Sequence, residues 1–156
     1  EQVRDARGVP HLRGLYAHWR KDAGWQTEDQ FSDGTLRLLG LLWVLIDGSQ
    51  PLLLEEPELS LHPEVIRFIP AMMARLSRKA GRQIIVSTHS ADLLSDLGIT
   101  SDEVLLLQPT PEDTKVLLAK NDDQIQQLLT GGLSVAEAVL PRTAPANAQQ
   151  LSFFGD

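Results

Sequence analysis

Apolar residues along this chain fall into short unbroken runs and longer runs at helical spacing. Two short runs, at residues 51–55 and 83–87, lack alternation and predict strands buried on both faces of a parallel sheet. The longer runs predict helices at residues 35–47, 63–80, 90–97 and 122–129. Strands and helices in this order predict an α/β fold with a mostly parallel sheet and flanking helices.

Glycine, proline and serine set the expected ends of these helices. Gly48 and Gly81 follow two of the helical runs and stop them. Pro63 suits the first position of a helix, whereas Pro70 lies inside the same run and is expected to kink it. Ser90 is the expected cap of the short helix that follows the second strand.

Antiparallel strands are expected on both sides of this α/β body. Loose alternation at residues 12–20, with Trp25 beyond a turn, predicts a short hairpin. Residues 103–107 and 115–119 predict two late strands around a proline-rich turn. Pro, Ala, Asn and Gln dominate the end of the chain and indicate a flexible linker. The expected division is a hairpin arm at 1–30, a body at 31–140 and a flexible tail at 141–156.

Composition favours a soluble cytoplasmic protein. The 156 residues suffice for one domain with a core, and 42% of them are hydrophobic. The apolar run at 38–46 is too short to cross a membrane. The chain has no cysteine, so disulfides and thiolate metal sites are excluded. A formal net charge of −7 argues against this region as the main nucleic-acid surface.

The most informative chemistry is a pair of acids directly after the first predicted strand. Glu55 and Glu56 follow three leucines, and Pro57 ends the segment. Groups at the carboxyl end of a parallel strand point into the crevice where open α/β sheets bind ligands. Two carboxylates there suit Mg²⁺ binding and water activation, the needs of nucleotide hydrolysis. A solvated turn is the alternative interpretation of this pair.

Three segments in order resemble a known family. Phe-Ser-Asp-Gly-Thr-Leu-Arg at 31–37, Glu-Glu-Pro-Glu-Leu-Ser-Leu-His-Pro at 55–63 and the strand with Ser-Thr-His-Ser at 83–90 resemble the C-terminal lobe of ABC-type ATPases. They correspond to the signature motif, the Walker B strand with its D-loop, and the switch histidine. The residues of these segments are most similar to those of the RecF and OLD group of AAA-type ATPases, which are soluble proteins of DNA repair and phage defence. The resemblance covers about residues 30–109.

The resemblance implies a role for each matching residue. Glu55 occupies the Mg²⁺ position, by direct or water-mediated contact, and Glu56 the position of the catalytic base. His89 matches the histidine that senses the γ-phosphate of ATP. The residues implied to meet ATP held by a second protomer are Ser32, Asp33, Gly34, Thr35, Arg37 and Ser60.

Simpler interpretations of these residues stay open. The segment from Ser32 to Thr35 is also typical of a helix cap, which uses the same free N–H groups as phosphate binding. Arg37 either offsets the charge of Asp33 at the phosphate or forms only a surface ion pair. His89 alone would more often be a packed or capping histidine.

No Gly-x-x-x-x-Gly-Lys-[Ser/Thr] phosphate loop occurs in the chain. The chain is therefore interpreted as the C-terminal half of a longer ATPase, inactive alone because the Walker A lobe is elsewhere. The resemblance implies ATP and Mg²⁺ sandwiched in a homodimer, no membrane contact, and a DNA-related task. The alternatives are an ABC transporter ATPase subunit and a non-catalytic interaction module.

The end of the chain carries one further motif. Gln150, Leu151, Ser152, Phe153 and Phe154 resemble the short peptide by which bacterial repair and replication proteins dock on the sliding clamp. Phe153 departs from the usual leucine. An apolar pentapeptide after a flexible linker is typical of a docking motif. Packing of these side chains onto their own domain is the alternative.

Overall fold

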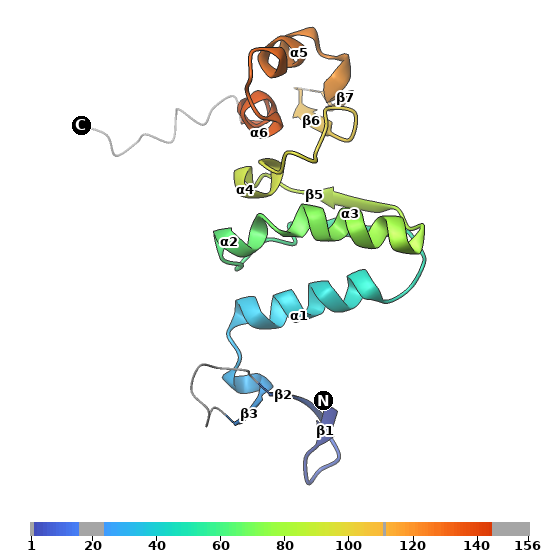
Figure 1. The fold of residues 1–156 in the computed structure, drawn as a ribbon, viewed down its shortest axis with the longest axis vertical. Coiled ribbons are helices and arrows are strands. Elements are labelled where there is room, and N and C mark those ends of the chain that lie inside the picture. Colours follow the sequence, from blue (N-terminus) through green and yellow to red (C-terminus); the bar gives the residue numbers. More distant parts are fainter. Residues whose placement is uncertain (1, 16–23, 111, 145–156) are drawn as a thin grey trace, which may run out of the picture.

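The computed structural model describes residues 2–15, 24–110 and 112–144, arranged in three groups along one long axis (Figure 1). An antiparallel sheet lies at one end, helices and a parallel strand pair lie in the middle, and a hairpin with two helices lies at the other end. This arrangement confirms the α/β fold class. No described helix combines the length and apolar character needed to cross a bilayer.

The N-terminal sheet contains three short antiparallel strands, β1 (Gln2–Arg4), β2 (Pro10–Leu15) and β3 (Trp25–Thr27). The predicted hairpin is thus present in β2 and β3, while residues 16–23 lie outside the described part. The guanidinium of Arg13 stacks over the Trp25 ring, 4.3 Å from its centroid. A 3-10 helix, η1 (Glu28–Gln30), follows and leads into the central layer.

The central layer contains four helices and the two predicted parallel strands. β4 (Leu52–Glu55) pairs in parallel with β5 (Ile84–Ser87), with Glu55 opposite Ser87. The helices are α1 (Asp33–Ile46), α2 (Pro63–Ile66), α3 (Ile69–Ala80) and α4 (Ala91–Leu94). Their shared core consists of Leu41, Leu45, Ile66, Ile69, Met73 and Leu93. The strand side chains Leu52, Leu54, Ile84 and Val86 pack against it.

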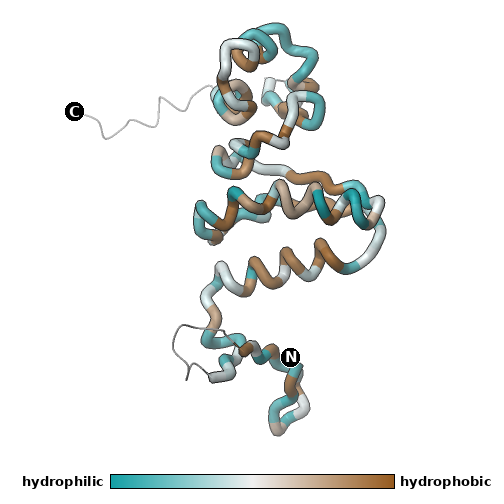
Figure 2. The backbone as a smooth tube through the Cα atoms, viewed as in Figure 1, coloured by the Kyte–Doolittle hydropathy of each residue, from teal (hydrophilic) through white to brown (hydrophobic). Residues whose placement is uncertain are grey.

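One prediction for this layer is wrong. The sheet was expected to be buried on both faces, yet Leu53 is 72% exposed and Ile85 is also exposed. The described helices supply core residues to one face only, so alternate strand residues remain in contact with solvent. The same layer also exposes apolar residues of α1, including Trp43 and Ile46, and the hydrophobic character of this helix is visible in Figure 2.

The helix expected at 63–80 is two helices rather than one kinked helix. Proline has no N–H to donate and its ring clashes with the carbonyl four residues earlier. Pro70 therefore cannot continue α2, and it lies in the first turn of α3, where no N–H partner is needed. The predicted stop at Gly81 is confirmed, with the residue in the left-handed conformation at φ 63°.

The C-terminal group pairs β6 (Leu105–Pro109) with β7 (Thr114–Leu118) in an antiparallel hairpin. The elements η2 (Ala119–Asn121), α5 (Asp123–Thr130), α6 (Val135–Val139) and η3 (Leu140–Arg142) follow. Both late strands and the predicted helix are present with shifted ends. Helix α6 was missed, although Ser134 and Glu137 form a capping box that its sequence displays.

Candidate functional site

The two acids lie where β4 ends, but they face different surroundings. Glu55 is the last residue of β4, exposed and on the same face as Leu53. The backbone N–H of Glu56 donates to the Ser87 carbonyl at 2.9 Å and so extends the pairing with β5. Glu56 also has φ 41°, a left-handed conformation that is uncommon for a residue with a side chain. Such backbone strain is concentrated at functional sites.

The structure brings Glu56 and His89 into direct contact. The Nδ1 atom of His89 lies 2.6 Å from Oε1 of Glu56. The His89 side chain is 76% exposed, whereas that of Glu56 is 29% exposed. The two residues follow adjacent parallel strands, whose carboxyl ends lie at the same edge of the sheet. The pairing of β4 with β5 therefore brings two of the expected site residues, Glu56 and His89, together at one edge of the sheet.

A tight turn after Glu56 contains a buried acid that the sequence did not single out. Glu58 is only 6% exposed, and one of its oxygens, Oε1, accepts a hydrogen bond from the Thr88 hydroxyl. The turn is closed by the N–H of Leu59 donating to the Glu56 carbonyl at 3.2 Å. Ser60, farther along, has φ 65°. Two residues with side chains are thus left-handed within one short turn.

The segment from Ser32 to Thr35 opens α1, as its cap-like sequence predicted. The N–H of Thr35 donates to the Ser32 hydroxyl oxygen at 3.2 Å, and the two hydroxyl oxygens are 2.8 Å apart. Gly34 lies directly against the Ser60 carbonyl, since a Cβ there would be 2.5 Å from that oxygen. The two segments expected to reach a second protomer therefore touch one another within one chain.

Arg37 and Asp33 form a weak surface pair. The Nε of Arg37 lies 3.7 Å from Oδ2 of Asp33, one helical turn away, and both side chains are largely exposed. This contact matches the ion-pair interpretation and also partly offsets the Asp33 charge beside Ser32. Exposed pairs of this kind contribute little to stability.

The acids at β4 have suitable donor chemistry for Mg²⁺, which prefers oxygen ligands and keeps several waters. Glu55 could supply one such oxygen. The described residues contain no group of three or more His, Cys, Asp or Glu able to hold a metal ion. Any Mg²⁺ here would therefore depend on water and phosphate oxygens for most of its ligands.

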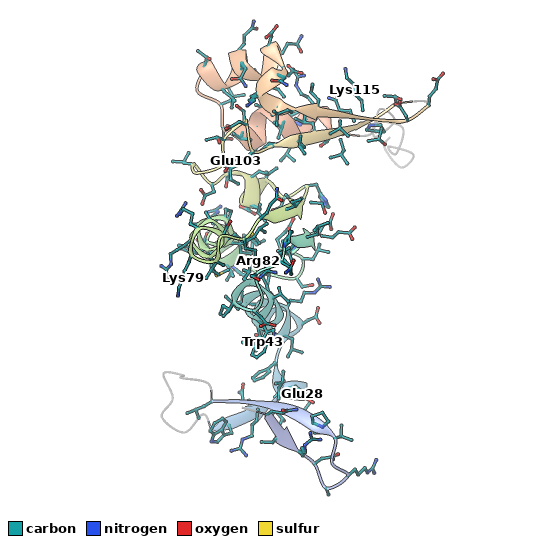
Figure 3. All side chains as sticks on the ribbon, turned by 90° about the vertical axis from the view of Figure 1, so that its right-hand side faces the viewer. Glu28, Trp43, Lys79, Arg82, Glu103 and Lys115 are labelled. Atoms are coloured by element: carbon teal, nitrogen blue, oxygen red, sulfur yellow. The ribbon has the colours of Figure 1, made fainter. Side chains whose placement is uncertain are left out.

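Arg82 is a buried charged residue that no local sequence signal indicated. It lies between α1 and α3 (Figure 3), and its guanidinium donates to three backbone carbonyls. These acceptors are Val44 at 2.8 Å, Asp47 at 2.7 Å and Gln50 at 2.6 Å. Arg82 thereby satisfies the carboxyl end of α1 and fixes the connection into β4.

Comparison with protein families matches residues 1–96 to the family described as "AAA domain, putative AbiEii toxin, Type IV TA system". The match covers more than half of the chain. The chain belongs to this AAA domain family.

Individual relatives are similar over shorter or weaker stretches. The "Uncharacterized ABC transporter ATP-binding protein YhcH" of Bacillus subtilis is 36% identical over 78 residues, covering 50% of this chain and 25% of the relative. "Methionine import ATP-binding protein MetN 1" of Burkholderia ambifaria is 27% identical over 139 residues, covering 81% of this chain and 40% of the relative. The protein of the same name from Burkholderia lata is 27% identical, covering 97% of this chain and 46% of the relative. This AAA domain thus spans less than half the length of each of these relatives.

Proposed function

We propose that this AAA domain forms one half of a composite site that hydrolyses ATP between two protomers. The observation that carries the proposal is the contact between Glu56 and His89, 2.6 Å apart at the carboxyl ends of adjacent parallel strands. An acid and a histidine in this position can orient a water and meet the terminal phosphate. Phosphoryl transfer depends mainly on such positioning and on charge stabilisation.

Each residue of the proposed site has a distinct task. Glu55 binds Mg²⁺ directly or through water, and bound Mg²⁺ would neutralise phosphate charge. Glu56 orients the attacking water, and His89 contacts the γ-phosphate. The opening of α1 meets ATP held by the partner protomer through Ser32, Gly34 and Thr35, with Asp33, Arg37 and Ser60 beside them. Free N–H groups at the start of this helix suit a phosphate.

The open face of the sheet supports the participation of a second, Walker A-containing lobe. Glu55 shares that face with the exposed side chains of Leu53 and Ile85. A parallel sheet is ordinarily covered on both faces, and apolar residues exposed this way commonly mark a contact surface.

The task coupled to hydrolysis has two candidates. The Glu-Glu-Pro-Glu and Leu-His-Pro segments favour a DNA-related process in repair, maintenance or phage defence. The names of the relatives favour an ABC transporter subunit instead. Stimulation of ATP hydrolysis by DNA supports the first, whereas co-purification with a membrane permease supports the second.

The decisive experiment uses the protein that contains both this domain and a Walker A lobe. Glu56→Gln should keep ATP binding, lower hydrolysis about 100-fold or more, and accumulate an ATP-bound dimer visible by light scattering. Ser32→Arg should retain nucleotide binding by the monomer but prevent dimerisation. Glu103→Gln is the matched control, because the Glu103 carboxylate bonds to Thr100 and not to a residue of the proposed site. Monomeric behaviour of both site variants in ATP would contradict the composite site.

This chain alone should bind ATP weakly and show no turnover, because it lacks the phosphate loop and its lysine. Hydrolysis by the purified chain that disappears in Glu56→Gln would contradict this proposal. Such hydrolysis would indicate that the catalytic site is complete within this chain, and it would contradict the alternative of a non-catalytic interaction module.

Clamp docking by residues 150–154 also remains a proposal from sequence, since these residues lie outside the described part. A peptide of residues 148–156 should bind purified sliding clamp in calorimetry and lose binding on Phe154→Ala. Equal binding by both peptides would contradict the docking role.

A further inference from the structure

We propose that Glu58 is a positioning residue, which fixes the location of His89 through a hydrogen bond to Thr88. This inference rests on the proposed function for its effect on ATP hydrolysis. Its structural part, the dependence of His89 on the buried Glu58–Thr88 pair, can be tested without any activity.

The direction of the hydrogen bonds at Thr88 follows from the groups around it. The Ser90 N–H can only donate, and it lies 2.9 Å from the Thr88 hydroxyl oxygen. The single hydroxyl proton of Thr88 is therefore free to be donated to Oε1 of Glu58. The resulting chain of hydrogen bonds runs from Glu58 in the turn after β4, through Thr88, to Ser90, the cap of α4.

His89 lies between Thr88 and Ser90, which are joined by the hydrogen bond from the Ser90 N–H to the Thr88 hydroxyl. Its side chain is 76% exposed, so little packing restrains the imidazole. The position of Nδ1 relative to Glu56 then depends on the backbone of Thr88 and Ser90. Ser90 is itself held by its role as cap, with the Leu93 N–H donating to its hydroxyl oxygen at 3.3 Å. Fixing Thr88 thus fixes the backbone on both sides of His89.

The burial of Glu58 is costly and is not explained by the core. A buried carboxylate is unfavourable unless its oxygens are hydrogen-bonded. Oε2 of Glu58 accepts no hydrogen bond from the described residues, and only Oε1 has a partner. Glu58 also lies between the left-handed residues Glu56 and Ser60. A costly acid in a strained turn, bonded only to the residue before His89, points to a role in the site.

The turn that contains Glu58 contacts two parts of the proposed composite site, the segment with His89 and the opening of α1. The turn that contains Glu58 also presents the Ser60 carbonyl to Gly34 at the opening of α1. A shift of α1 on contact with a partner protomer would therefore move the same turn that holds Thr88. Glu58 is placed to link the position of His89 to the segment proposed to meet the partner's ATP.

The structural test uses nitrogen NMR of the His89 imidazole in this 156-residue chain, assigned with His89→Gln. Thr88→Val removes the hydroxyl at nearly constant shape, and Thr88→Ser retains it. Thr88→Val should move the Nδ1 resonance toward that of a free imidazole, while Thr88→Ser should leave it unchanged. Thr100→Val removes the hydroxyl of another threonine paired with acids and serves as the matched control. An unchanged resonance in folded Thr88→Val overturns the proposal.

A second variant protects this test against loss of folding. If valine places a methyl group too close to Glu58, Thr88→Ala removes the same hydroxyl without that methyl. Glu58→Leu removes the acceptor of the Thr88 hydroxyl, so it should shift the His89 resonance in the same way as Thr88→Val. Variants at 58 and 88 that both leave His89 unperturbed contradict the inference.

The kinetic test uses the protein with its Walker A lobe. Thr88→Val should lower kcat for ATP about 10- to 100-fold and change KM little, because misplacing a reacting group costs rate rather than affinity. The same change in a His89→Gln background should have no further effect. An equal kcat loss in both backgrounds overturns the route through His89. Absence of hydrolysis even in the unaltered protein would instead contradict the proposed function and leave the NMR result to decide the inference.

Discussion

The central layer and the C-terminal group use different means to hold their elements together. Among the described residues, the C-terminal group buries only apolar side chains, namely Leu106, Ala119, Ile125, Ala136, Ala138 and Val139. Helices α5 and α6 begin with ordinary side-chain caps, and Gly132 is the one left-handed residue that the structure describes in this group. The central layer instead buries two charged residues, Glu58 and Arg82, and holds Glu56 and Ser60 in left-handed conformations.

This difference separates structural from functional demands. The C-terminal group satisfies local preferences nearly everywhere, which is typical of a region selected for packing. The central layer violates them in one short turn, next to Glu56 and His89. Residues that break local rules are expected at functional sites, where the rest of the fold compensates for their cost.

The largest expected loss of stability is in the C-terminal group. Ile125 is fully buried, so Ile125→Ala leaves a cavity and should lower the free energy of unfolding by about 2–4 kcal/mol. Leu128→Ala in the same helix is the control, because Leu128 is exposed and should cost under about 1 kcal/mol. Urea unfolding measures both. Equal losses would show that α5 does not pack as described.

Arg82→Ala should have the next largest effect, in the central layer. The change leaves three backbone carbonyls without their guanidinium partner, and we expect a loss of about 3 kcal/mol in urea unfolding. Arg78→Ala on the exposed last turn of α3 is the control and should change little. A small loss at both positions would mean that the central layer does not depend on its buried charge.

Substitution by alanine at Gly34 and at Gly40, both in α1, should change the free energy of unfolding in opposite directions. A Cβ at Gly34 would meet the Ser60 carbonyl oxygen at 2.5 Å, so Gly34→Ala should cost about 1–3 kcal/mol. A Cβ at Gly40 meets nothing within 4 Å, so Gly40→Ala should stabilise the helix by about 0.5–1 kcal/mol. Thermal unfolding should separate the two variants. Stabilisation by both would contradict the close contact between α1 and the turn.

Local patterns were sufficient to predict the two parallel strands and the end of α3 at Gly81. The expected strands at 51–55 and 83–87 correspond closely to β4 and β5, because unbroken leucine and isoleucine runs have few alternatives. The stop at Gly81 follows from its left-handed conformation, whereas α1 already ends at Ile46 with Asp47 extended before Gly48. The contact between Glu56 and His89 was not itself predicted, and it follows from the parallel pairing of β4 with β5, which brings the ends of the two strands together.

The features that were missed depend on contacts between distant segments. Arg82 and its three carbonyls are more than 30 residues apart, and Glu58 and Thr88 are 30 apart. No spacing in the sequence displays such pairs. The uncovered face of β4 was missed for a related reason: strand composition indicates burial, but not which part of a protein supplies the covering layer. The contact of Gly34 with Ser60 was likewise not visible from either motif.

The smallest expected effect concerns the N-terminal sheet, where no described residue is buried and a polar cluster contributes to the packing instead. His11 Nδ1 lies 2.5 Å from Oε1 of Glu28 and its Nε2 lies 3.6 Å from Oδ2 of Asp5, with Asp29 next to Glu28. The hydrogen bond to the Glu28 side chain, with a further contribution from Asp5, raises the pKa of His11. The Leu12 N–H and His11 lower the pKa of Glu28, and the Val9 N–H is the main cause that lowers the pKa of Asp5.

These directions set the pH dependence of the N-terminal sheet. A raised histidine pKa contributes stability that is complete below the unfolded value of about 6.5 and is lost as pH rises through the folded value. The lowered acid pKa values contribute stability above about pH 4.5 that is lost on acidification. Hydrogen exchange of the Leu12 amide, which donates to Glu28, should therefore be slowest between these limits after correction for intrinsic pH dependence. His11→Gln should remove the loss of protection on the alkaline side, and an unchanged alkaline profile in that variant would exclude His11 as its cause.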